Sequence, residues 1–166
     1  MHGTLAGGLS GKYYLYVQAL LTIIITMFER CLYFNLNALT RKVNRIWESE
    51  FRQTGLSAPH AYVMRLVLSE PGISQKQLAE ELHLAPSTVT RFVDALAERR
   101  LVRRDTSHTD RRSAAVFPTA EGKRLQKKLE KIGEGLFQAM RTRLGDKQFQ
   151  ELVRALREAR STLEKS

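Results

Sequence analysis

Two short helical patterns joined by a three-residue turn constrain the fold of this chain more than any other feature of its sequence. Ser74 and Gln77 have the Ser-x-x-Gln spacing of a capping box, which predicts that a helix begins here and runs to about Leu82. Pro86 is suited to the first turn of a second helix, because the N–H that proline lacks would be unpaired there in any case. With residues 83–85 as the turn, the spacing predicts a helix-turn-helix.

The second of these helices has two chemically different faces. One face is apolar at helical spacing, which predicts burial of Val89, Phe92, Val93 and Leu96. The other face carries short polar side chains and an arginine in its first turns: Ser87, Thr88, Thr90 and Arg91. Serine and threonine are poor interior helix formers, whereas hydroxyl and guanidinium groups suit base edges and phosphates in the DNA major groove. We therefore expect these four side chains, with Gln75 on the preceding helix, to bind DNA; a solvated helix face is the alternative.

A predicted β-hairpin follows the helix-turn-helix. Residues 101–104 and 114–117 have the composition of two short strands, and a polar loop joins them. Arg111 and Arg112 lie on this loop, where arginine side chains can enter a narrow minor groove with its concentrated negative potential. Asp110 would repel phosphate, so we expect it to position Arg112 through a charge-assisted hydrogen bond. The alternative for Asp110 is an exposed ion pair that contributes about 0–1 kcal/mol.

Basic residues outnumber acidic residues and concentrate beside this module. The chain has 27 Lys and Arg against 17 Asp and Glu, a formal net charge of +10. Residues 99–112 alone hold 6 basic and 2 acidic side chains. This balance favours a polyanionic partner, with double-stranded DNA ahead of an anionic membrane surface.

Apolar residues at helical spacing also predict helices on both sides of the module. We expect one helix from residue 28 to about 51, another that begins at Ser57 as its cap, a third that Thr119 caps, and a last helix over 147–164. One small winged domain could not bury the apolar stripes of the outer helices alone, so a homodimer is expected.

The predicted fold class is mainly α with a small β-hairpin wing. In this arrangement a winged helix-turn-helix over residues 57–119 lies between dimerisation helices at 28–56 and 120–166.

The N-terminal residues 1–27 need a separate interpretation. Tyr13 to Phe28 is an apolar run of 16 residues, fewer than the ~20 that a membrane-spanning helix requires. Glu29 and Arg30 follow it directly, without the small residues of a signal-peptide cleavage site. We expect an N-terminal extension that is either non-native or an extra helix at a dimer interface, in preference to membrane insertion.

Catalytic and metal-binding patterns are absent from the sequence. It has one cysteine and four scattered histidines, and neither metal-ligand spacing nor a nucleophile–base pair or a phosphate-binding loop occurs. A single thiol cannot form an intramolecular disulfide, which fits a reducing cytoplasm. We therefore predict a cytoplasmic, non-enzymatic protein without cofactor or metal.

Residues 56–125 resemble the MarR family of bacterial winged helix-turn-helix regulators. The segments that carry the resemblance are 73–79, 84–91 and 110–112, followed by Val116-Phe117-Pro118-Thr119 and Gly122. Pro118 stands where the family pattern usually has Leu, and proline lacks a ladder donor, so the strand should end there. The resemblance implies a homodimeric repressor whose outer helices interdigitate, and a pseudo-palindromic operator.

The resemblance also implies a signal that releases the protein from DNA. In the family this signal is typically a small molecule bound between the dimer helices and the winged domain, and some members instead sense oxidants through a cysteine near the first helix. Cys31 lies close to such a position, and Arg30 beside it would favour a reactive thiolate; a buried apolar cysteine is the alternative. Location alone makes Trp47, His60, Tyr62 and Arg65 candidates for an effector pocket. A winged-helix adaptor that binds proteins without reading DNA is the competing function.

Overall fold

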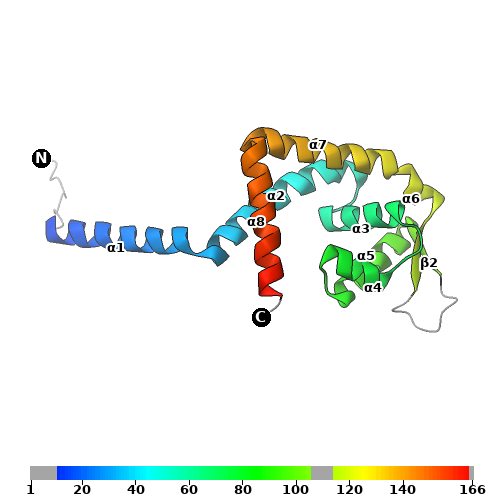
Figure 1. The fold of residues 1–166 in the computed structure, drawn as a ribbon, viewed down its shortest axis with the longest axis horizontal. Coiled ribbons are helices and arrows are strands. Elements are labelled where there is room, and N and C mark those ends of the chain that lie inside the picture. The colour runs from blue at the N-terminus through cyan, green and yellow to red at the C-terminus, as the bar shows by residue number, and fades with distance from the viewer. Residues whose placement is uncertain (1–10, 106–113, 165–166) are drawn as a thin grey trace, which may run out of the picture. The chain divides into compact units, whose positions relative to one another are not determined.

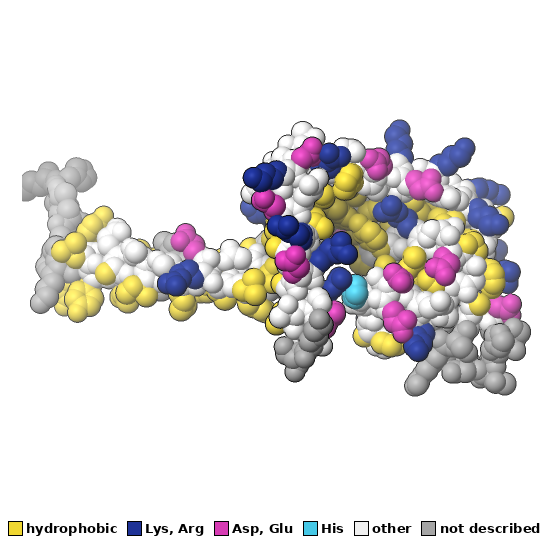
Figure 2. Space-filling view, viewed as in Figure 1, with side chains coloured by type: hydrophobic (Ala, Val, Ile, Leu, Met, Phe, Trp, Pro, Cys, Tyr) yellow, Lys and Arg dark blue, Asp and Glu magenta, His cyan; other side chains and the backbone are white. Residues whose placement is uncertain are grey.

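The computed structural model describes residues 11–105 and 114–164, which form two compact units divided between Arg45 and Ile46. The first unit contains α1 (Gly11–Arg30) and most of α2 (Leu32–Phe51) (Figure 1). Apolar side chains lie exposed along α1 (Figure 2). Over the described ranges no single helix is long and apolar enough to cross a membrane, although α1 and α2 together pass that test as a bent pair.

The expected single helix from residue 28 is wrong, because the helix is interrupted at Cys31. The side-chain amide of Asn35 donates hydrogen bonds to the carbonyl oxygens of Glu29 and Cys31, each at 2.9 Å. The Glu29 carbonyl belongs to the last turn of α1, where carbonyl groups lack helical partners, whereas the Cys31 carbonyl also accepts from the backbone N–H of Asn35 at 3.1 Å. A side chain four residues beyond the break therefore completes the last turn of α1.

The second unit contains the winged domain. Its elements are η1 (Arg52–Thr54), α3 (Ala58–Ser69), β1 (Ile73–Ser74), α4 (Gln75–Leu82), α5 (Pro86–Glu98), β2 (Val102–Asp105) and β3 (Ala115–Pro118). The strands form an antiparallel sheet in the order β1-β3-β2. The two predicted strands are confirmed with a shift of one residue, and β3 ends at Pro118 as expected. Strand β1 was not predicted, because two residues are too short for an alternating pattern.

Three further helices complete the second unit: α6 (Ala120–Arg124), α7 (Gln126–Leu144) and α8 (Asp146–Leu163). The sequence predicted one helix where α6 and α7 are separate, with the break at Leu125. Gly145, at a left-handed φ of 79°, ends α7 as the Gly-Asp pair predicted. In Figure 1, α7 runs over α3, and α8 turns back from the end of α7.

Apolar residues of α3, α5 and α7 form the core of the winged domain. The predicted inner face of α5 is fully buried at Val89, Val93 and Leu96, while Phe92 is only partly buried. The core also includes Val63, Met64, Val67, Leu78, Val116, Leu129 and Ile132. This packing holds α5 with its opposite face outward, which is the face that matters for the site.

Local caps explain why the short helices begin where they do. The Ser74–Gln77 capping box is confirmed in both directions, and the Thr119 side chain accepts a hydrogen bond from the Gly122 N–H. Ser57 occupies the predicted cap position of α3 but makes no cap bond, because its Oγ lies 2.6 Å from Nδ1 of His60. Glu48 accepts from the Ala58 N–H at 3.0 Å instead, so an acidic side chain satisfies the start of α3.

Candidate nucleic-acid interface

The outer face of α5 carries the polar residues that the sequence singled out. Ser87, Thr90 and Arg91 are exposed, and Thr88 is half-buried. Helix α5 begins at Pro86, which has no N–H, and the Thr88 and Val89 N–H groups donate to the Ala85 carbonyl oxygen at 2.9 and 3.2 Å. Hydroxyl groups, a guanidinium and a positive helix end thus share one surface, which suits phosphates and base edges.

Gln75, the fifth expected contact residue on these two helices, lies beneath this surface. It is the first residue of α4 and only 7% exposed. Its Oε1 accepts a hydrogen bond from Oγ1 of Thr90 at 3.1 Å, and the same hydroxyl lies 3.0 Å from the Pro86 carbonyl oxygen. The structure thus joins Gln75 to a residue of the outer face of α5, and its contact with DNA stays a prediction.

An ion pair that the sequence analysis missed joins strand β2 to α5. Nη1 of Arg104 lies 2.6 Å from Oδ1 of Asp94, and Nη2 donates to the Thr90 carbonyl oxygen at 3.4 Å. The alternation of inward and outward side chains along β2 could have indicated this ion pair, because Arg104 lies on the same inward side of the strand as the buried Val102. Thr90 and Asp94, four residues apart, share one face of α5.

The arginines of the basic run are largely engaged inside the domain. Arg99 donates to the Gly55 carbonyl oxygen at 2.7 Å, and the Arg103 guanidinium lies 4.6 Å from the centre of the Phe117 ring. With Arg104 paired to Asp94, three arginines that raised the local charge have structural contacts. Among the described residues, only Arg104 of the three is paired with an acidic side chain, so the expectation of a polyanionic partner that rests on charge density is unchanged.

The expected wing residues Asp110, Arg111 and Arg112 lie outside the described residues. The strands that lead to them are described: Asp105 pairs with Ala115 at the end of the β2–β3 ladder. Strand β2 packs against α5, with Arg104 beside Thr90 and Asp94 of that helix.

The effector candidates separate into two groups. Nε1 of Trp47 donates to the Tyr62 hydroxyl at 2.9 Å, and the Arg65 guanidinium lies 5.7 Å from the centre of the Tyr62 ring. Tyr62 and Arg65 line an open cavity of about 440 Å³, together with Leu66, Leu68, Ser69, Glu81, Leu82, Gln126 and Glu130. His60 instead packs against Phe92 of α5, with ring centres 4.7 Å apart.

Cys31 is a free, half-buried cysteine at the break between α1 and α2. Its backbone N–H donates to the Phe28 carbonyl, and its own carbonyl accepts from Asn35. Among residues 11–105 and 114–164, no three His, Cys, Asp or Glu side chains come together as a metal site would require.

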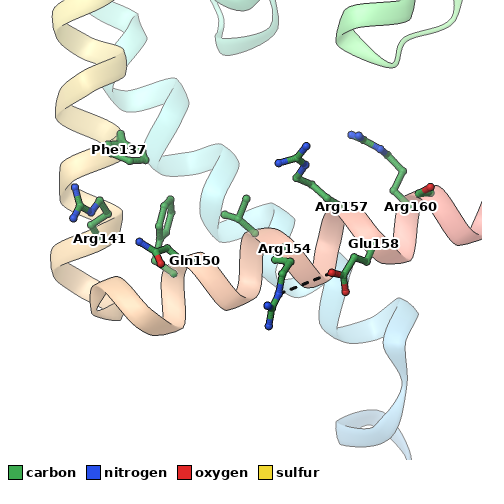
Figure 3. A pocket seen from close by; sticks show the side chains of 10 residues that line it. Phe137, Arg141, Gln150, Arg154, Arg157, Glu158 and Arg160 are labelled. Atoms are coloured by element: carbon green, nitrogen blue, oxygen red, sulfur yellow. Dashed lines mark ion pairs between the residues drawn. The ribbon is translucent and has the colours of Figure 1, made fainter.

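A second open groove, of about 700 Å³, lies along α7 and α8 (Figure 3). Phe137 and Phe149 meet edge to face at 5.5 Å in its floor, beside Val153. Arginine side chains surround this apolar floor, and Arg154 pairs with Glu158 at 3.9 Å. An apolar strip with a charged rim has the composition of a protein interface.

Comparison with known proteins supports the geometric interpretation. The family model described as "MarR family" matches residues 56–114. The transcriptional regulator HosA of Escherichia coli O111:H- is 32% identical over 116 residues, which cover 68% of this chain and 84% of that protein. Two solved structures share the fold. The S. aureus MepR–DNA complex has a TM-score of 0.69 at 16% identity and covers 81% of this chain and 98% of that one. The transcriptional repressor CouR, bound to a 23-mer DNA duplex, has a TM-score of 0.69 at 22% identity and covers 79% and 93%.

Proposed function

The chain belongs to the MarR family of transcriptional regulators, and on that premise we propose that it is a repressor that binds a pseudo-palindromic operator as a homodimer. A small-molecule or oxidant signal releases it from the DNA. A protein with this role acts where the chromosome is, so we place it in the cytoplasm. The DNA complexes of MepR and CouR, which share its fold, support the choice of ligand.

One observation carries the proposal: the first turns of α5 expose Ser87, Thr90 and Arg91 on the side opposite the buried Val89 and Val93. A helix held in this way can place its N-terminal residues against base edges in the major groove. We propose that these residues, with Thr88, contact bases and phosphates. Arg111 and Arg112 of the wing add minor-groove or phosphate contacts, and Asp110 supports them.

Arg91→Ala tests the assignment of α5. Duplexes that the wild-type protein selects from a random pool provide the probe, and fluorescence anisotropy gives Kd. Loss of a guanidinium–base contact should weaken binding roughly tenfold or more and relax selectivity at one base pair, since such contacts contribute about 1–3 kcal/mol. Lys131→Ala on α7 removes an equal charge from an exposed site outside α5 and should leave Kd nearly unchanged. Equal effects of the two substitutions would contradict the assignment of α5, whereas a winged-helix adaptor predicts that the wild-type protein selects no duplex at all.

The unpartnered face of α8 supports the proposed dimer. Leu152 and Phe149 are only half-buried, and Val153 and Leu156 are 40% and 41% exposed, so within the described chain this helix has no buried residue. The apolar groove along α7 and α8 continues this face (Figure 3). Exposed apolar strips of this kind mark interaction surfaces, and a second copy of the chain presents the same strip for a two-fold contact.

Two routes for the releasing signal remain distinct. The cavity beside Tyr62 and Arg65 lies between α3, α4 and α7, so a ligand there would contact both the helix-turn-helix and the helix that leads to α8. Arg65→Ala should abolish release by a small-molecule effector while leaving DNA affinity unchanged. Cys31→Ser should instead abolish release by peroxide if the signal is oxidative, and unchanged release would exclude that route.

A further inference from the structure

Three side chains meet along one face of α5. Asp94 belongs to α5 itself, Gln75 reaches this face from the start of α4, and Arg104 reaches it from β2. We propose that these residues, here called the α5 brace, are positioning residues that fix the orientation of α5 relative to α4 and to strand β2, and thereby set base selectivity. The inference rests on the proposed function, because it assumes that α5 reads DNA.

Thr90 is the point at which the brace meets the DNA-facing residues. Its hydroxyl has one hydrogen to donate and lies 3.1 Å from Oε1 of Gln75 and 3.0 Å from the Pro86 carbonyl oxygen, and its own carbonyl oxygen accepts from Nη2 of Arg104 at 3.4 Å. One residue of the outer face is therefore held from the α4 side through its side chain and from the β2 side through its backbone. Arg91, the next residue, takes its direction from this fixed turn.

The contacts of Arg104 are those of a side chain that links two elements of its own domain, rather than those of a side chain that binds DNA. Its side chain is 26% exposed, and its Nη1 lies 2.6 Å from the Asp94 carboxylate, one turn along α5 from Thr90. Its Nε is buried and has no hydrogen-bond partner among the residues that the structure describes. The guanidinium contacts α5 twice, once at Asp94 and once at the Thr90 carbonyl oxygen, so the side chain joins β2 to that helix.

The arrangement also explains the presence of an acidic residue on this helix. Asp94 is a carboxylate on the same face of α5 as Thr90, where it would repel phosphate unless it were neutralised. Arg104 supplies that neutralisation from the adjacent strand. The pair thus cancels a charge next to the proposed interface and joins α5 to the wing in one contact.

Measurements of selectivity distinguish positioning from direct contact. Kd is measured for the selected operator, for its single-base-pair variants and for an unrelated duplex. The proteins compared are the wild type, the single variants Gln75→Ala, Asp94→Ala and Arg104→Ala, and the Asp94/Arg104 double variant. Arg124→Ala, which removes an exposed ion pair within α6, is the matched control. Thermal unfolding of each variant shows that it is folded, and Arg104→Lys and Asp94→Asn provide milder forms of the two substitutions.

The brace predicts that the ratio of operator to unrelated-duplex affinity falls about tenfold in each single variant, with no additional loss in the double variant because the pair acts as a unit. Affinity for the unrelated duplex and the salt dependence of operator binding should stay as in the wild type. If Arg104 contacts phosphate instead, Arg104→Ala weakens all duplexes alike and lowers the salt slope by about 1, while Asp94→Ala strengthens binding. That result, or selectivity unchanged in folded variants, overturns the inference. Failure of the wild-type protein to select any duplex overturns the proposed function itself.

Discussion

At the scale of the residue, Gly122 shows how closely the wing and α6 approach each other. A Cβ added at Gly122 would lie 2.1 Å from the Leu101 carbonyl oxygen and 2.6 Å from Cε of Met64. The first of these atoms belongs to the backbone of the segment that enters β2, so it cannot move aside as a side chain would. The glycine therefore fixes the distance between α6 and the base of the hairpin.

Gly122→Ala should destabilise the protein by about 2 kcal/mol or more, because overpacking against backbone forces a shift of whole elements. Gly135→Ala is the matched control, since nothing lies within 4 Å of the added Cβ in α7. That substitution should stabilise the protein by about 0.5–1 kcal/mol through helix propensity. Urea denaturation measures both, and similar effects of the two substitutions would refute the close approach.

We expect His60 to make the stability of the winged domain depend on pH. Burial, reinforced by the positive charge of Arg99, lowers the pKa of His60 from its ordinary value of 6.5, and Glu48 opposes the shift only in part. The folded state therefore holds His60 neutral, while the unfolded chain takes up a proton as the pH falls through 6.5. The contribution of His60 to stability is present above this pH and is lost as the pH falls below it.

We expect the free energy of unfolding to decrease between about pH 7.5 and pH 5.5, and His60→Gln to reduce that decrease. Urea denaturation at several pH values measures the slope for both proteins. Identical slopes would show that groups other than His60 cause the dependence.

At the scale of the element, α8 is amphipathic but has no buried residue within the described chain. Leu156→Arg should convert the dimer to a monomer and reduce operator affinity by at least about tenfold, because each half-site contributes to binding. Light scattering after size-exclusion chromatography measures the mass. Lys147→Ala on the same helix is the control. A dimer that survives both Leu156→Arg and Val153→Arg would place the interface elsewhere.

Helices whose ends depend on local side chains could be predicted from the sequence. The capping box at Ser74 and Pro86 at the first turn of α5 gave the helix-turn-helix with correct boundaries, since both features act within a few residues. Elements that depend on distant partners could not be predicted in this way. Strand β1 exists because Ile73 pairs with Val116 of β3, and the break before α2 depends on the side chain of Asn35.

The same distinction applies to the candidate site. The exposed positions of Ser87, Thr90 and Arg91 follow from helical periodicity alone, so the sequence placed them correctly. The burial of Gln75 and the pair between Asp94 and Arg104 require the three-dimensional arrangement of α4, α5 and β2. Residues that hold the interface in place were therefore harder to find than residues that form its surface.

At the scale of the whole molecule, the exposed polar face of α5 and the unpartnered face of α8 are complementary requirements of one function. A single winged domain contacts only one half-site, and a two-fold pair of domains doubles the number of base contacts. DNA recognition and dimerisation are therefore two parts of the proposed function, and one measurement can test them together.

That measurement is selection of bound duplexes from a random pool by the full-length protein, followed by determination of the motif and of the protein mass per duplex. We expect an inverted repeat with half-sites about 10 base pairs apart, bound by two chains, with affinity that falls steeply as salt increases. Absence of enrichment over the starting pool, or an enriched motif without two-fold symmetry bound by one chain, would contradict it.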